Sequence, residues 1–415
     1  MGENKYKRLF TNTVFLYLLT FSNYLMSFIT VPYQTRVLGP DIYGVLGLTA
    51  SLMIYFQLVI DFGFLLSATA DVSKNRNDKN KISKIFSSVS SLKLVLTALS
   101  LAVLVVLCLC VDRWKEHFAF ILLYFVSISI NSFLPDYLYR GIEQMGAITV
   151  RTVLIKLFFT VMIFVVVKGP EDYLLIPTLQ IIGNFVALVC SVIHVRVKYG
   201  IKLVKCTLRE LVDCLKNSST FFWSRIATTF YTAANTVVLD LLSGGGMTAY
   251  YTSADKLVST AKSGLSPISD SLYPYMIQNR DFKLVKKMLW IFEPIIIVGC
   301  AVVFIWAEPL CTWFFGDEYV MSAYALRALL SIVIITLPTY ICGYPVLGAL
   351  GFNNHANYSV VVGSVFHIVV LCLLFFTGNL TMISLAVSTS ATEAVILAYR
   401  VIVIFKNRNK WKSAE

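Results

Sequence analysis

The sequence predicts an all-α membrane protein with about twelve transmembrane helices, arranged as two pseudo-symmetric lobes of six helices. Three observations predict this fold class. First, 57% of the 415 residues are hydrophobic, only 14% are charged, and the mean hydropathy is +0.74. An ordinary soluble domain has about 25% charged residues, so this chain lacks the polar surface that even one such domain needs. The second observation is a series of long apolar runs, and the third is a one-sided distribution of basic residues.

The apolar runs are long enough to cross the hydrocarbon core, which takes about 20 residues of helix. They lie near 9–33, 43–70, 86–110, 118–139, 149–167, 173–195, 217–241, 247–274, 288–306, 322–350, 357–376 and 380–404. Two of them, 43–70 and 322–350, are expected to tilt or kink, and Pro338 and Pro345 support a kink in the second. The basic segment 196–216 separates an N-terminal lobe, residues 1–200, from a C-terminal lobe, residues 201–415.

Lysine and arginine indicate the side of the membrane on which each connecting segment lies. If the N-terminus is cytoplasmic, the inner segments hold 25 of these residues and the outer segments hold four. We therefore expect both termini in the cytoplasm. The net charge of +12 follows from this topology, so nucleic acid is not expected as a partner. No protease, phosphate-loop or hydrolase motif occurs, and the cysteines and histidines lack metal-ligand spacing, so neither catalysis nor a metal is expected.

Short motifs recur at a distance of about half the chain. Pro135 begins Pro-Asp-Tyr, and Pro338 begins Pro-Thr-Tyr 203 residues later; residues 75–79 have a counterpart at 279–283, offset by 204. Leu38-Gly39 in the first expected outer turn matches Ser243-Gly244. Two halves of six spans have the same orientation in the membrane, and such repeats place a substrate site between them. This favours transport by alternating access.

Six basic residues fall within the expected spans: Lys93, Lys156, Arg225, Lys256, Lys262 and Arg327. The first three lie about eight residues from the inner ends of their spans, or ~12 Å, which is far for a side chain to reach the headgroups. Several cations at a common depth predict a cavity that binds an anion, and arginine and lysine both bind phosphate. Snorkelling explains any single one of them equally well.

Carboxylates accompany these cations within the spans. Asp61 and Glu393 are candidates for coupling transport to H⁺ or Na⁺, because burial raises the pKa of a carboxyl group. Asp255 is a third candidate, although it lies seven residues from Lys262 on one helical face and could instead form a structural ion pair with it.

Polar residues also form stripes on two of the expected spans. They are Asn23, Ser27, Thr30 and Gln34 on the first span, and Ser218, Arg225, Thr229, Thr232 and Thr236 on the seventh. Such stripes indicate either a wet cavity or hydrogen bonds between helices.

Several motifs resemble those of polysaccharide-exporting members of the MOP superfamily. Residues 36–44 resemble the turn after the first span, and residues 61–69 and 75–79 resemble the second and third spans of Wzx-type repeat-unit flippases for O-antigen and capsule. Lys93 stands where that pattern carries a lysine, and residues 135–145 resemble the end of the fourth span. Residues 315–319 resemble an outer turn of the second half, whereas Ala70-Asp71 departs from the pattern, which has a basic residue there.

The resemblance implies a V-shaped, two-lobed MATE-like flippase of the bacterial cytoplasmic (inner) membrane. Its substrate would be an undecaprenyl-diphosphate-linked oligosaccharide, moved to the outer leaflet for O-antigen, lipopolysaccharide or capsule synthesis. Besides this glycan and membrane lipid, a polysaccharide polymerase and a chain-length regulator are implied as partners. No cofactor is implied other than H⁺ or Na⁺ coupling. Arg225 is the first candidate to contact the diphosphate, followed by Lys93 and Lys156.

Two alternatives remain at this point. A multidrug exporter of the same superfamily often moves cations, so acids rather than bases would be expected in its cavity. A membrane-embedded polysaccharide polymerase or ligase would carry a large outer loop with catalytic residues, whereas the longest outer segment expected here, near 307–321, has about fifteen residues.

Overall fold

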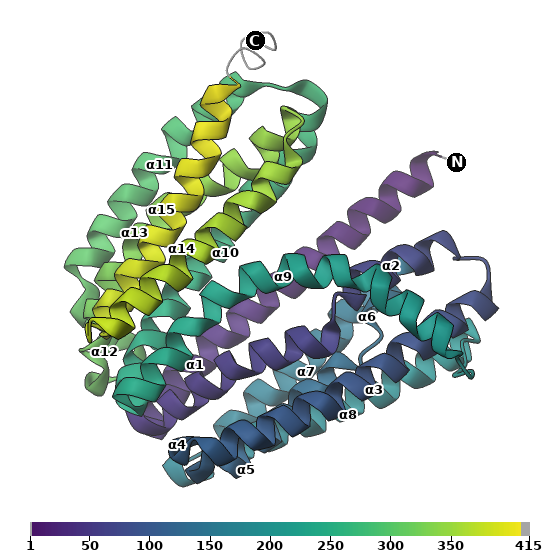
Figure 1. Ribbon diagram of the computed structural model, residues 1–415, viewed down its shortest axis with the longest axis horizontal. Helices are drawn as coiled ribbons and strands as arrows, with labels where there is room; N and C mark the ends of the chain where they lie inside the picture. The colour runs from purple at the N-terminus through teal and green to yellow at the C-terminus, as the bar shows by residue number, and fades with distance from the viewer. Residues whose placement is uncertain (1, 408–415) are drawn as a thin grey trace. The chain divides into compact units, whose positions relative to one another are not determined.

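The computed structural model describes residues 2–407, except for the side chains of residues 2–10, 12, 13, 16, 220, 224, 227, 228, 230–232, 274, 278, 279 and 353. Every element of this part of the chain is a helix (Figure 1). The helices are α1 (Gly2–Asp61), α2 (Phe64–Lys74), α3 (Lys79–Cys110), α4 (Asp112–Glu116), α5 (Phe118–Ser132), α6 (Asp136–Gly141), α7 (Met145–Val166), η1 (Pro170–Leu174), α8 (Leu175–Tyr199), α9 (Leu208–Ser243), α10 (Gly245–Asn279), α11 (Phe282–Ile305), α12 (Ala307–Phe315), η2 (Asp317–Tyr319), α13 (Ser322–Ile341), the π-helical turn η3 (Cys342–Leu347), α14 (Asn353–Phe376) and α15 (Met382–Lys406).

The long helices confirm an all-α, multi-pass membrane protein. Within residues 2–407, nine helical stretches are long and apolar enough to cross a membrane. The first of these, Tyr17–Lys74, is 58 residues long and contains a break, so it accounts for two of the expected spans. Helices α9 and α10 are 36 and 35 residues long but more polar, and they cover the seventh and eighth expected spans. Each of the twelve apolar runs thus coincides with a helical segment.

Glycine breaks the helices at matching positions in the two halves. Gly39 has φ 70° and ψ 171° within α1, and Gly244, 205 residues later, has φ 86° and ψ 177° between α9 and α10. Residues with side chains rarely adopt this conformation. Asp78 and Asp281, 203 residues apart, both cap the helix that follows them, α3 and α11, by accepting backbone N–H groups. Two of the repeated motifs therefore perform the same local tasks in both halves, whereas the proline motif does not, because Pro135 precedes α6 and Pro338 lies inside α13.

The apolar runs 43–70 and 322–350 are both interrupted, as expected. Phe62 and Gly63 have positive φ values of 37° and 77°, which end α1 at Asp61 and start α2. In the tenth run, Gly343 has a ψ of −123° between the two prolines, and α13 gives way to the π-helical turn there. Proline removes a backbone donor and clashes with the preceding turn, so it favours a break at this point.

The chain divides into two compact units. The N-terminal unit consists of the residues up to Leu38 together with Thr49–Ile226, and the C-terminal unit consists of Gly39–Leu48 and the residues from Ala227 onward. In the N-terminal unit α5 and α7 pack on α8, and α2 packs on α6. In the C-terminal unit α13 packs on α10 and α15, and α14 packs on α15 (Figure 1). These units are defined by contacts and the expected lobes by a repeat, so the lobe boundary at residue 200 remains a prediction.

The basic linker between the halves is held along α3. Its backbone donates from Lys202 to the Ser83 hydroxyl (3.2 Å) and from Val204 to the Ser87 hydroxyl (2.8 Å). Thr207 and Glu210 then form reciprocal hydrogen bonds at the start of α9, as in a capping box. The hydrogen bond from Lys84, followed by those from Thr207, lowers the pKa of Glu210 to about 2.

We expect Gly39→Ala to destabilise the protein by about 1–3 kcal/mol, the typical cost of a residue with a Cβ in this backbone conformation. Crowding is not the reason, because the nearest atom to a Cβ at this position, Glu318 Oε2, is 3.7 Å away. The thermal unfolding midpoint of the purified protein measures the effect. Gly264→Ala is the matched control: it lies in α10, its Cβ would meet no atom within 4 Å, and helix propensity favours alanine there. Equal midpoints for the two variants would show that α1 does not break at Gly39.

Candidate functional site

The first ion pair lies in the N-terminal unit, where three helices meet. Lys93 of α3 donates to Asp61 Oδ1 at the end of α1 (2.9 Å) and to the carbonyl oxygen of Ser132, the last residue of α5. The side chain of Lys93 is only 6% exposed and that of Asp61 is 24% exposed. The structure thus joins a residue expected to bind substrate and a residue expected to couple an ion into one buried contact.

A polar cavity of about 290 Å³ also lies in the N-terminal unit, between α1, α7 and α8. Lys156 is its cation, and Ser27 and Thr30 of the predicted polar stripe on the first span line it. Gln180 and Asn184 of α8 complete the polar wall. This cavity can hold hydroxyl groups and an anionic group, because its lining combines one cation with neutral donors and acceptors.

The second ion pair lies in the C-terminal unit. Lys262 of α10 donates to Glu393 Oε1 of α15 at 2.6 Å, and their side chains are 24% and 8% exposed. The pair lines a second polar cavity, of about 300 Å³, together with Ser266, Asp270 and Tyr344. The partner of Lys262 therefore comes from another helix, 131 residues away, while the predicted pairing with Asp255 remains untested.

Arg400 also lines this second cavity, which the sequence did not predict. Its place in the sequence groups it with the basic residues beyond the inner end of the last span, but the structure places it within α15, 8% exposed. Its guanidinium donates to Thr339 O (2.5 Å), Ser359 Oγ (2.9 Å) and Ala356 O (3.3 Å). Its position seven residues after Glu393, on the same helical face, was the available signal.

The bend of α13 and Arg400 fit together closely. A Cβ added to Gly343 would lie 2.7 Å from Nη1 of Arg400. A larger residue at the break would therefore displace the guanidinium, which supports a carbonyl of the bent helix from the cavity side. The cavity and the break are parts of one arrangement.

A buried histidine network next to the second cavity was also missed. His367 of α14 is fully buried, with Nδ1 2.8 Å from Thr392 Oγ1 and Nε2 3.0 Å from Asn235 Oδ1. The Asn235 amide donates to Tyr251 (3.0 Å) and Thr389 (2.6 Å). Four helices thus share one hydrogen-bonded network, and no sequence spacing links residues so far apart in the chain. Among the described residues no group of three or more His, Cys, Asp or Glu residues could hold a metal ion.

The other candidate residues line neither of these two polar cavities: Arg225, Asp255, Lys256 and Arg327. Arg327 pairs with Glu308 Oε1 of α12 (2.9 Å) and donates to Phe304 O (3.1 Å). Lys256 is exposed on α10, next to the half-buried Asp255, and Arg225 is exposed on α9.

The polar stripe on α9 serves helix packing at one end. Ser218 lies 2.7 Å from the Ser67 hydroxyl and donates to Cys214 O (2.8 Å), so it joins α9 to α2. Thr236 is buried farther along α9, and the side chain of Thr232 lies outside the described residues. At Ser218, the polar stripe therefore makes hydrogen bonds between helices and does not line a wet cavity.

We expect Lys93→Met to lower the free energy of unfolding by about 2 kcal/mol, below the 3–5 kcal/mol typical of a fully buried pair, because Asp61 is partly exposed. Asp61→Asn in the same protein removes the orphaned charge, so the double variant should recover about 1 kcal/mol of this loss. Thermal unfolding of the four proteins measures this cycle. Lys81→Met on the same helix is the control, since its exposed contact with Asp78 is worth under about 1 kcal/mol. If the changes in the free energy of unfolding caused by Lys93→Met and Asp61→Asn simply add in the double variant, that result contradicts the ion pair.

The chain is similar over nearly its whole length to two proteins that are named as putative O-antigen transporters. A protein from Shigella dysenteriae named "Putative O-antigen transporter" is 26% identical over 395 residues, which is 94% of this chain and 98% of that relative. A protein of the same name from Escherichia coli (strain K12) is 24% identical over 414 residues, 98% of this chain and 99% of that relative. These matches agree with the resemblance seen in the sequence motifs.

Solved structures share the fold. A lipid II flippase MurJ in an inward closed conformation matches with a TM-score of 0.75 at 14% identity, covering 95% of this chain and 87% of that one. An inward-facing multidrug resistance MATE family transporter of the MOP superfamily matches with a TM-score of 0.70 at 11% identity, covering 94% and 95%. The family described as "Polysaccharide biosynthesis protein" matches residues 9–280, about two thirds of the chain. The chain belongs to this polysaccharide biosynthesis protein family.

Proposed function

We propose that the protein is a flippase that moves undecaprenyl-diphosphate-linked oligosaccharide repeat units across the bacterial cytoplasmic membrane, for the synthesis of O-antigen or capsule. The relatives are named as transporters and flippases, and this chain is a multi-pass membrane transporter and not an enzyme. The observation that carries the proposal is the polar cavity of the C-terminal unit, where Lys262, Glu393 and Arg400 line about 300 Å³ within membrane helices.

The chemistry of the substrate explains why such cavities are needed. A diphosphate and a hydrated glycan cannot enter hydrocarbon without losing the water bound to their charges and hydroxyl groups. Serine, threonine, tyrosine and amide side chains replace that water, and cations balance the phosphate charge. Transport neither makes nor breaks a covalent bond, so the two polar cavities need no catalytic group.

Alternating access between the two halves, with both termini in the cytoplasm, completes the proposal. The repeat of six spans and the excess of basic residues in the inner segments support it. Glu393 is the first candidate for coupling to H⁺ or Na⁺, because it lines a cavity and already contacts a cation there. Asp61 and Asp255 are the further candidates. A polysaccharide polymerase would take up the flipped repeat units, together with a chain-length regulator.

Deletion of the gene tests the proposal directly. We expect loss of surface glycan, with undecaprenyl-linked repeat units held in the cytoplasmic leaflet, as measured by gel analysis of surface polysaccharide and by a leaflet-specific assay of the lipid-linked units. Single repeat units that reach the outer face without being polymerised would instead indicate a polymerase. Normal glycan with hypersensitivity to drugs would indicate a multidrug exporter.

When the deletion strain is complemented with the Lys262→Met variant, surface glycan should be reduced by at least about tenfold compared with the wild-type gene. This is the effect of losing about 1.4 kcal/mol of substrate binding. Lys283→Met is the matched control, because Lys283 is exposed at the start of α11 and lines neither polar cavity.

Arg225→Ala should also reduce export if Arg225 contacts the diphosphate. Membrane fractions blotted for each variant separate loss of transport from loss of protein. Normal glycan in both Lys262→Met and Arg225→Ala would contradict a cationic substrate path.

A further inference from the structure

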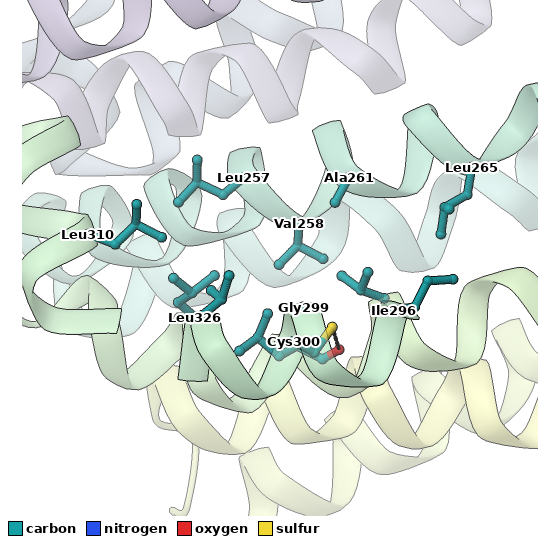
Figure 2. A pocket seen from close by; sticks show the side chains of 12 residues that line it. Leu257, Val258, Ala261, Leu265, Ile296, Gly299, Cys300, Leu310 and Leu326 are labelled. Carbon is teal, nitrogen blue, oxygen red and sulfur yellow. Dashed lines mark hydrogen bonds between the residues drawn. The ribbon is translucent and has the colours of Figure 1, made fainter. Parts of the chain in front are cut away.

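A third cavity, of about 380 Å³, lies inside the C-terminal unit between α10, α11, α12 and α13 (Figure 2). None of the 12 residues that line it carries a charged or amide side chain. The interaction drawn among them, from Cys300 Sγ to the carbonyl oxygen of Leu330, is a weak contact of 3.9 Å. The cavity is therefore apolar throughout, in contrast to the two polar cavities.

Small residues keep the cavity open. Ala261 of α10 and Gly299 of α11 line it from facing walls, and a Cβ at Gly299 would meet no atom within 4 Å. Protein interiors seldom contain voids much larger than a water molecule, and water is retained only where polar partners surround it. A hydrocarbon chain is the occupant that matches this lining.

The lining of the cavity extends along α10, which suits a single hydrocarbon chain that lies parallel to this helix. Its lining on α10 runs from Leu257 to Leu265, which is about 12 Å of helix. Large apolar residues of α11, such as Ile295 (63%) and Val298 (62%), are exposed on the surface of a membrane-spanning helix, which indicates contact with lipid. The cavity thus lies behind a helix that faces the bilayer.

Two of the residues that line one end of the cavity have a basic neighbour in the chain. Leu257, Leu310 and Leu326 lie together at that end (Figure 2). Lys256 precedes the first of them in the chain and is exposed, and Arg327 follows the last. Each cation has an acidic neighbour, since Glu308 pairs with Arg327 and Asp255 precedes Lys256 in the chain, so an anionic head group would compete with these carboxylates. A diphosphate, which carries more charge than the single phosphate of a phospholipid, suits that competition with two cations better.

We propose that this apolar cavity binds part of the polyprenyl chain of the lipid-linked glycan, with the diphosphate beside Lys256 and Arg327. The inference rests on the proposed function and adds the binding site of the lipid tail. It also gives a role to two span cations that line neither polar cavity. The contact between Arg327 and Glu308 then exchanges for a contact with phosphate when the lipid binds.

Native mass spectrometry of the purified full-length protein with added undecaprenyl diphosphate tests this site. Gly299→Phe and Ala261→Phe, which fill the cavity from opposite walls, should each reduce the bound fraction by at least about tenfold. Ala301→Phe should bind like the wild type, because Ala301 is exposed on α11 at the same depth and does not line the cavity. Lys256→Met should weaken binding of undecaprenyl diphosphate more than binding of undecaprenol, which has the same chain but no charge.

The outcomes separate this proposal from the function on which it rests. Wild-type protein that binds no undecaprenyl diphosphate would overturn both. Wild-type binding that both filling variants retain would overturn the tail site alone. Variants that lose co-purified phosphatidylglycerol but still bind undecaprenyl diphosphate would show a phospholipid site and would also overturn it. Size-exclusion profiles identify a variant that fails to fold, and the variant from the opposite wall then decides.

Discussion

A backbone amide within the hydrocarbon core has no water to bond with, and the architecture of this protein follows from that constraint. Continuous helices satisfy it without help, whereas each break leaves carbonyl groups that need another donor. Two buried cations supply such donors. Lys93 donates to Ser132 O at the end of α5, and Arg400 donates to Thr339 O just before the bend of α13. A positive charge at the C-terminal end of a helix is also favoured by the helix dipole.

Four of the cations within the membrane show two kinds of surroundings. Lys93 is almost completely buried and is held by a carboxylate and a backbone carbonyl, which suits a structural role. Lys156 and Lys262 line cavities large enough for part of a glycan or a phosphate group, which suits contact with substrate. Arg400 belongs to both groups, because it supports the bend and also faces the cavity. The depth of a cation within its span does not by itself distinguish a structural role from contact with substrate. The two roles differ in which helix ends lie near the cation.

Much of the fold could be predicted from the sequence, because hydrophobic runs, glycine and proline act locally. The twelve apolar runs, the kink between Pro338 and Pro345, and the repeated turn at Gly39 and Gly244 are all present. The candidate site was predicted only in outline. Lys262 and Glu393 each stand out in the sequence, but not as partners, since they lie on different helices.

The roles of Arg400 and His367 could not be predicted from the sequence for a similar reason. Arg400 resembles a residue of the inner segments because basic residues follow it closely in the chain, although it lies within α15. His367 carries no distinguishing neighbour in sequence, and its partners come from two other helices. Local patterns indicate where a helix lies and where it breaks. They do not indicate which helices meet, and the polar contacts in this protein are made where helices meet.

The matching breaks at Gly39 and Gly244 bear on how such a chain could arise. The sequence predicts six spans between the two glycines, and with that number the chain would return to the same side of the bilayer before the pattern begins again. A gene segment encoding an even number of crossings can be duplicated in tandem and inserted without inverting the second copy. Each copy then keeps its own basic segments on the side where they began. A unit with an odd number of crossings would first need an ancestor able to insert in both orientations.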